Sequence, residues 1–212
     1  MSILDDISAA VQAGNKGEVE KLTQQCIDDG MSADEILNGG LMAAMNIIGP
    51  KFKNNEIFMP EVLMAARALN GGTALLKPLL MEAGGGVAGY GIIGTVKGDM
   101  HDIGKNLVRM MIEGKGIEMI DLGVDVPPEK FVEAIKAHPE VKIVALSALL
   151  TTTLPALQEA VKAIIDAGLH DQVKIMVGGA PVTQEFADQI GADVYTEDAV
   201  SAGEAAIKLI QE

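Results

Sequence analysis

The stretch Val141-Lys-Ile-Val-Ala-Leu-Ser147 is apolar at five of its seven positions, which is typical of a strand buried on both faces of a sheet. Around it, the chain beyond residue 85 alternates such runs with amphipathic stretches of helical length. This alternation predicts an α/β domain with a doubly wound, five-stranded parallel sheet and right-handed crossovers. The predicted strands are 90–96, 118–122, 143–147, 174–177 and 193–195, and the predicted helices are 105–113, 128–137, 154–166, 183–189 and 199–210.

The first 84 residues follow a different, all-α pattern. Apolar residues recur there at helical spacing, Ser32 and Glu35 predict a capping box, and Pro60 suits the first turn of a helix. We expect a four-helix bundle over 1–84 and a flavodoxin-like sheet over 85–212, joined by a hinge at 84–86. The predicted helices of the bundle are 2–13, 17–29, 32–53 and 60–80.

Composition excludes several classes of partner. The 212 residues include 16 Lys+Arg and 30 Asp+Glu, so the net charge is −14, and aromatic residues make up only 3%. Such a chain repels phosphate backbones and anionic lipids, and we expect neither a nucleic acid nor a membrane as partner. Asp5 and Asp6 stand where a signal peptide is basic, so we expect a cytoplasmic protein. Cys26, the single cysteine, is expected to have no chemical role.

Three polar motifs follow the ends of predicted strands. The first strand leads into Gly98-Asp-Met-His-Asp-Ile-Gly104, the third into Ser147-Ala-Leu149 and the threonines 151–153, and the fourth into Gly178-Gly179. In the flavodoxin-like order 2-1-3-4-5, strands 1, 3 and 4 are neighbours, and ligands bind beyond their carboxyl ends. The motifs should therefore converge on one site that contains His101. The other two histidines, at 138 and 170, are expected to lie on the surface.

Several kinds of chemistry fit this pattern poorly. Ser147 lacks the G-x-S-x-G turn of a hydrolase nucleophile, zinc would need three or four ligands, and flavin would favour flanking aromatic residues. A receiver domain would place an aspartate at the end of the third strand. A loop histidine that is merely hydrogen-bonded to Asp99 stays possible. The other possibility is a single His101 ligand to a metal held by a macrocycle, with Asp99 fixing the tautomer.

The spacing of the three motifs, 42 and 28 residues apart, resembles that of cobalamin-binding modules of the methionine synthase type. The resemblance implies that His101 is the lower axial cobalt ligand of a base-off cobalamin or related corrinoid, within a His101-Asp99-Thr153 relay. It also implies that Ser147 and Thr151 face the benzimidazole, and that the two glycines 178 and 179 admit the nucleotide tail. The implied cofactor-binding residues of this half are Gly98, Asp99, Met100, Asp102, Ile103, Gly104, Ser147, Leu149, Thr151, Thr153, Gly178 and Gly179, with no catalytic residue of its own.

The stretch from Phe52 to Val62 resembles the helical cap that covers the upper face of the corrin in this family. On that resemblance Phe52, Met59 and Val62 would shield a methyl group on the cobalt. As residues of a bundle alone, the same three would be ordinary core. A bundle plus a cobalamin-binding domain, with no methyltransferase barrel, is similar to the corrinoid shuttle proteins of anaerobic methyltransferase systems.

That resemblance implies a carrier and not an enzyme acting alone. A substrate-specific methyltransferase would methylate Co(I), and a second methyltransferase would pass the methyl from methyl-Co(III) to a thiol such as coenzyme M or to tetrahydrofolate. A reductive activation protein would reduce oxidised cobalt to Co(I). The methyl donor stays open among methanol, methylamines, methoxylated aromatics and betaines. The alternatives are a cobalamin-dependent sensor or regulator, the small subunit of an adenosylcobalamin mutase, and a flavodoxin-like electron carrier.

Overall fold

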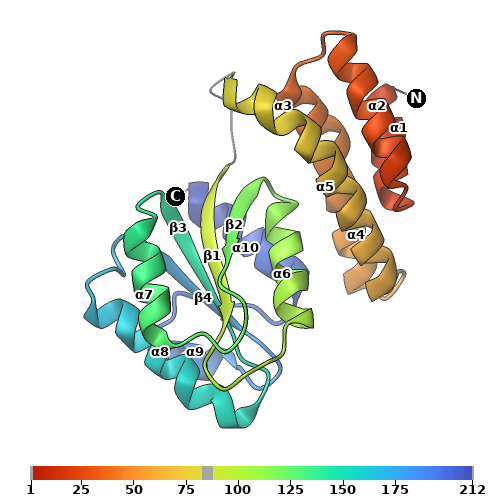
Figure 1. The fold of residues 1–212 in the computed structure, drawn as a ribbon. Coiled ribbons are helices and arrows are strands. Elements are labelled where there is room, and N and C mark those ends of the chain that lie inside the picture. The colour runs from red at the N-terminus through yellow and green to blue at the C-terminus, as the bar shows by residue number, and fades with distance from the viewer. Residues whose placement is uncertain (1, 83–87, 212) are drawn as a thin grey trace. The chain divides into compact units, whose positions relative to one another are not determined.

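The computed structural model describes residues 2–82 and 88–211, and the chain divides into two compact units, Met1–Gly86 and Val87–Glu212 (Figure 1). The hinge expected at 84–86 lies outside the described residues. Among those described, no helix is long and apolar enough to cross a membrane.

The first unit is the predicted helical bundle. The predicted third helix is one helical run in which a π-helical turn separates two α-helical parts, a detail that the apolar spacing did not indicate. The elements are α1 (Ile3–Gln12), α2 (Lys16–Asp28), α3 (Ala33–Ile36), the π-helix η1 (Leu37–Met42), α4 (Ala43–Lys53) and α5 (Met59–Glu82).

Local capping explains where these helices begin. The Ser32 side chain accepts a hydrogen bond from the backbone N–H of Glu35 at 3.2 Å, which is one half of the predicted capping box. A complete box forms at Ser2, where the Asp5 N–H donates to Ser2 Oγ and the Ser2 N–H donates to Asp5 Oδ2. Pro60 occupies the second position of α5, where a missing N–H costs no helical hydrogen bond.

The second unit confirms the predicted flavodoxin-like fold. Its five strands are all parallel and follow the order β2-β1-β3-β4-β5. The strands are β1 (Gly89–Thr95), β2 (Ile117–Asp121), β3 (Val141–Ser147), β4 (Lys174–Gly178) and β5 (Val194–Tyr195). The helices are α6 (Ile103–Glu113), α7 (Pro128–Ala137), the 3₁₀ turn η2 (Thr151–Thr153), α8 (Leu154–Asp166), α9 (Gln184–Ile190) and α10 (Ala199–Gln211).

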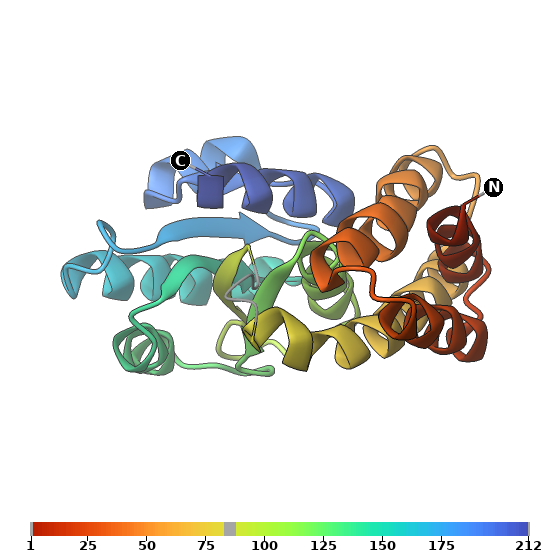
Figure 2. The same ribbon diagram turned by 90° about the horizontal axis from the view of Figure 1, so that it is seen from above.

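Helices cover both faces of this sheet (Figures 1 and 2). The core on one face contains residues of α7, α8 and α9, whereas the core on the other face contains residues of α6 and α10. Both cores consist of aliphatic side chains, with Phe131 as the one fully buried aromatic ring among the described residues. Burial on both faces explains why β3 reads as a continuous apolar run.

Candidate corrinoid site

The loop between β1 and α6, residues 96–102, is held in one conformation by hydrogen bonds. Thr95 Oγ1 donates to the His101 carbonyl at 2.8 Å, and the Gly98 N–H donates to Asp125 Oδ1 at 2.7 Å. The Asp125 N–H in turn donates to the Asp99 carbonyl at 3.0 Å. Gly98 has a φ of 81°, a conformation that favours glycine. The loop is therefore held by hydrogen bonds within the protein itself.

Asp99 lies at the centre of this loop and is fully buried. Its Oδ1 accepts hydrogen bonds from His101 Nδ1 at 2.7 Å and from the His101 N–H at 3.1 Å. Its Oδ2 accepts from the N–H groups of Leu149 and Leu150, at 2.7 and 3.3 Å, and from Thr153 Oγ1 at 2.9 Å. The carboxylate thus connects the β1–α6 loop to the segment that follows β3, as the convergence of motifs predicted.

These bonds keep Asp99 ionised. Burial alone would raise the pKa of Asp99, but the hydrogen bonds from Leu149, His101 and Thr153 hold that pKa well below its ordinary value. An ionised carboxylate can only accept, so His101 Nδ1 must carry the proton that it donates. In the neutral imidazole the lone pair is then on Nε2. The His101 side chain is half exposed, which leaves Nε2 accessible to a metal ion.

Four large apolar side chains, on the two chain segments that meet at Asp99, remain exposed. Met100 and Ile103 are 69% and 70% exposed, and Leu149 and Leu150 are 41% and 40% exposed. We call these four residues the apolar rim. Exposed apolar side chains near one accessible nitrogen suit a broad, apolar ligand that covers them.

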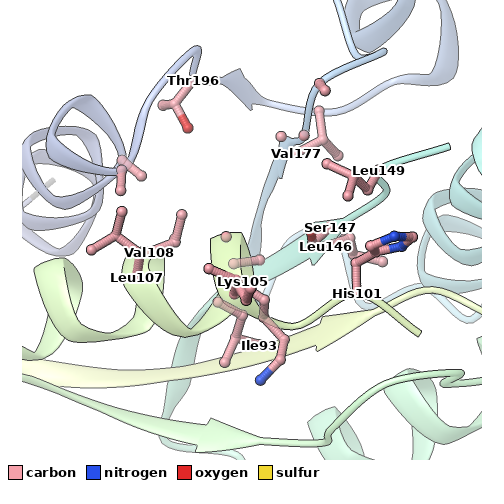
Figure 3. Close-up of a pocket in the computed structure, with 18 of the residues that line it drawn as sticks. Ile93, His101, Lys105, Leu107, Val108, Leu146, Ser147, Leu149, Val177 and Thr196 are labelled. Atoms are coloured by element: carbon pink, nitrogen blue, oxygen red, sulfur yellow. The ribbon is translucent and has the colours of Figure 1, made fainter. Parts of the chain in front are cut away.

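Beside the apolar rim a pocket of about 500 Å³ opens between α6, α10 and the carboxyl ends of β1, β3 and β4 (Figure 3). His101, Ser147 and Leu149 lie on one side of it, and Leu107 and Val108 of α6 lie on another. The predicted site residues in its lining are Met100, His101, Asp102, Ile103, Gly104, Ser147, Leu149, Gly178 and Gly179.

The remaining predicted residues of this unit lie outside the lining. Asp99 and Thr153 are buried; Asp99 accepts a hydrogen bond from the His101 imidazole, and Thr153 Oγ1 donates to Asp99. Gly98 contributes its bond to Asp125. Thr151 is exposed at the start of η2, and its predicted contact with the benzimidazole stays a prediction.

Two glycines of the motifs, Gly179 and Gly104, lack a side chain for different physical reasons. Gly179 has a φ of 126°, and a Cβ added there would lie 1.9 Å from the Ala148 carbonyl oxygen. The protein's own backbone therefore excludes a side chain at this position, with or without a nucleotide tail. A Cβ added to Gly104 would meet nothing within 4 Å, so Gly104 faces open space in the pocket.

The predicted cap residues belong to the helical unit. Phe52 and Met59 keep part of their surface exposed, whereas Val62 is fully buried. Ile47, Phe58 and Met64 are more exposed, at 42%, 63% and 47%, and no sequence motif singled them out. The cap role of Phe52, Met59 and Val62 stays a prediction.

A charged cluster beneath α6 was not predicted. Lys105 is buried, and its Nζ donates to both carboxylate oxygens of Asp121, at 2.7 and 2.6 Å. Arg109 Nη1 donates to Asp121 Oδ2 at 3.0 Å. Burial tends to raise the pKa of Asp121, but the hydrogen bond from Lys105 and the two cations lower it overall. The Lys105 cluster ties the first turns of α6 to the end of β2.

The donor set fits a metal whose other ligands come from a cofactor. Among residues 2–82 and 88–211, no group of three or more His, Cys, Asp or Glu side chains is placed to hold a metal ion. His138 and His170, each with an acidic partner, lie on the surface far along the chain from the motif. One accessible imidazole nitrogen beside an apolar rim and a deep pocket matches a macrocycle with a side arm.

Comparison with known proteins decides the family. A family model described as a B12 binding domain matches residues 89–206, and a second model with the same description matches residues 3–77. The chain belongs to the B12-binding corrinoid proteins. The two matches cover the sheet domain and the helical bundle of this corrinoid protein, respectively.

Relatives of the corrinoid protein match over nearly their whole length. A dimethylamine corrinoid protein of Methanosarcina barkeri is 40% identical over 201 residues, which are 94% of this chain and 93% of the relative. A corrinoid protein of Desulfitobacterium hafniense (strain Y51) is 37% identical over 213 residues, which are 99% of this chain and 98% of the relative.

A solved structure extends the likeness to the fold. The methanol:cobalamin methyltransferase complex of Methanosarcina barkeri contains a chain with a TM-score of 0.85 and 28% identity. The match covers 99% of this chain and 80% of the other.

Proposed function

We propose that this corrinoid protein carries a methyl group for a methyltransferase system, with cobalt held from below by His101 Nε2. The observation that carries the proposal is the His101-Asp99-Thr153 arrangement, which presents one accessible imidazole nitrogen beside the apolar rim. When bound, the corrinoid supplies a cobalt centre that accepts and releases a methyl group.

Asp99 acts as the positioning residue for His101. Its Oδ1 receives Nδ1–H at 2.7 Å, which fixes the ring orientation and raises the basicity of Nε2. Thr153 can donate its single hydroxyl proton either to Asp99 or to the Leu150 carbonyl, both at 2.9 Å. The ionised carboxylate is the stronger acceptor, so this hydroxyl supports the charge of Asp99.

The surfaces around His101 would hold the rest of the cofactor. The apolar rim suits the lower face of the macrocycle, and the pocket beyond Gly104 would take the nucleotide tail in a base-off form. Phe52, Met59 and Val62 of the helical unit would shield the upper face. Val62 would act only indirectly, since its side chain is buried.

Two partner methyltransferases act with this carrier in the proposal, one that supplies the methyl group and one that removes it. The relatives include a dimethylamine and a trimethylamine corrinoid protein, which supports a methylamine as the class of methyl donor. The proposal further includes a second methyltransferase, with a thiol such as coenzyme M or tetrahydrofolate as acceptor, and a reductive activation protein. A cytoplasmic location also stays part of the proposal.

Replacing the ligand histidine tests this function. We expect His101→Ala to lose the absorption spectrum of histidine-coordinated cobalt after reconstitution with hydroxocobalamin, and to bind the corrinoid about ten-fold or more weaker. His138→Ala is the matched control, because that histidine is also about half exposed and hydrogen-bonded to an acid. Unchanged cobalt coordination in His101→Ala would refute the ligand assignment.

A further inference from the structure

The floor of the pocket is a row of three side chains on neighbouring strands. Ile93 of β1 is the register partner of Ala145 of β3, which is in turn the partner of Met176 of β4. Register partners in a parallel sheet point to the same face, and all three line the pocket. Because the alanine lies between two longer side chains, the row has a notch over Ala145.

The residues between this notch and the carboxyl ends of β3 and β4 are small. Ser147 and its register partner Gly178 lie two residues beyond Ala145 and Met176, on the same face, and both line the pocket. Both residues are small. A flat group that enters from the side of His101 can therefore pass Ser147 and reach the notch.

The inner part of the pocket is the protein's own apolar core. Ile93, Ala145 and Met176 belong, with Ala202 of α10, to the buried core between the sheet and the helices α6 and α10. Leu107 and Val108 of α6 complete the wall (Figure 3).

The polar side chains of the lining lie elsewhere. Ser147 is the last residue of β3, and Thr196, Glu197 and Asp198 lie between β5 and α10. Lys105 contributes its aliphatic stem, since its ammonium group is bound to Asp121.

Resting on the function proposed above, we infer that this pocket selects corrinoids whose lower base is an apolar aromatic ring, such as benzimidazole, over corrinoids with a purine base. The amino group and ring nitrogens of a purine over Ala145 would face the apolar side chains of Ile93, Met176 and Ala202. The backbone around Ala145 pairs with β1 and β4. A purine would therefore give up hydrogen bonds to water without replacing them.

Titration of the full-length chain with three corrinoids tests this inference. The three are cobalamin, which has a benzimidazole base, its adenine analogue pseudocobalamin, and cobinamide, which has no base. We expect cobalamin to bind at least about ten-fold more tightly than pseudocobalamin. This ratio corresponds to the free-energy cost of burying one or more unpaired polar groups of the purine. Equal dissociation constants for the two would overturn the inference.

Two substitutions at the notch sharpen the test. Ala145→Ser offers a hydroxyl to the purine and should reduce the preference for cobalamin about five-fold. Ala145→Val fills the notch and should weaken both base-bearing corrinoids about ten-fold while the affinity for cobinamide stays the same. If Ala145→Val leaves the affinities for all three unchanged, the base does not reach this row and the inference fails.

Ala160→Val is the matched control for added volume. Ala160 is equally small and fully buried, but it belongs to the core on the opposite face of the sheet. We expect it to change none of the three affinities, and thermal unfolding of each variant checks the fold. Electron paramagnetic resonance of the Co(II) form, prepared with ¹⁵N in the histidines of the protein, separates the two proposals. Histidine-coordinated cobalt with equal affinities overturns only the base selectivity, whereas cobalt still bound by benzimidazole contradicts the function proposed for His101.

Discussion

Asp99 determines the state of the site at the scale of a single residue. A buried carboxylate is unfavourable unless donors surround it, and here five hydrogen bonds from four residues do so. Its negative charge fixes the proton on His101 Nδ1. The nitrogen that we propose binds cobalt therefore depends on a residue that does not itself reach the pocket.

Asp99→Asn should reduce stability by about 1–3 kcal/mol at pH 7, because an amide nitrogen would face donors that now meet a carboxylate. Thr153→Val should cost about 1 kcal/mol, since it removes one donor among several. Urea unfolding measures both. A variant Asp99→Asn as stable as the original chain would contradict the electrostatic role.

The stability of the chain should also depend on pH through Asp99. The folded pKa of Asp99 lies below its unfolded value, so its contribution is present above the unfolded pKa, about 4. The contribution is lost as pH falls through the lowered folded pKa. Unfolding of the original chain and of Asp99→Asn at several pH values should therefore give a stability difference that shrinks below about pH 4. A difference that is constant with pH would count against this assignment.

Gly104 and Gly179 should respond differently to the same substitution. Gly179→Ala should destabilise the fold, because of its positive φ and the clash with the Ala148 carbonyl. Gly104→Ala should leave thermal stability nearly unchanged, because its added methyl group meets open space, but should weaken corrinoid binding. Thermal unfolding and corrinoid titration of both variants check this contrast, and equal destabilisation would argue against it.

At the scale of elements, the strands could be predicted more closely than the helical unit. The predicted strand 143–147 lies within β3, and 174–177 lies within β4, because buried parallel strands leave unbroken apolar runs. The π-helix η1 could not be predicted, because its apolar spacing continues that of the α-helices on either side.

The features of the site likewise divide into those that the sequence motifs predict and those that depend on the folded structure. Strand order predicted that the motifs of Asp99, His101 and Thr153 meet at one edge of the sheet, and the family resemblance implied the relay among the three residues. The amide donors of Leu149 and Leu150 could not, because backbone groups have no sequence signature. The pairing of Lys105 with Asp121 was likewise hidden, because it depends on how α6 sits against the end of β2.

The Lys105 cluster should stabilise the contact between α6 and β2. Lys105→Met leaves Asp121 with Arg109 as its remaining cation and should cost about 1–3 kcal/mol, because the removed charge is buried. Lys162→Met is the control, since its ion pair with Asp166 is largely exposed and should contribute less than about 1 kcal/mol. Urea unfolding compares them, and equal costs would contradict the role of burial.

At the scale of the whole molecule, the residues proposed to hold the cofactor come from both units. The sheet unit contains His101, the apolar rim and the pocket, and the helical unit contains the residues predicted to shield the upper face. The net charge of −14 belongs to a chain whose binding surface is apolar. Recognition of the cofactor should therefore depend weakly on salt.

We propose that the nitrogen bound to cobalt belongs to His101 and not to the corrinoid's own base. Electron paramagnetic resonance of the Co(II) form, prepared with protein whose histidines contain ¹⁵N and with unlabelled cobalamin, tests this directly. We predict that each cobalt line splits into two, because ¹⁵N has nuclear spin one half, and that unlabelled protein gives three. Three-fold splitting in the labelled protein would show that the benzimidazole of the cofactor stays on the cobalt, and would contradict the account.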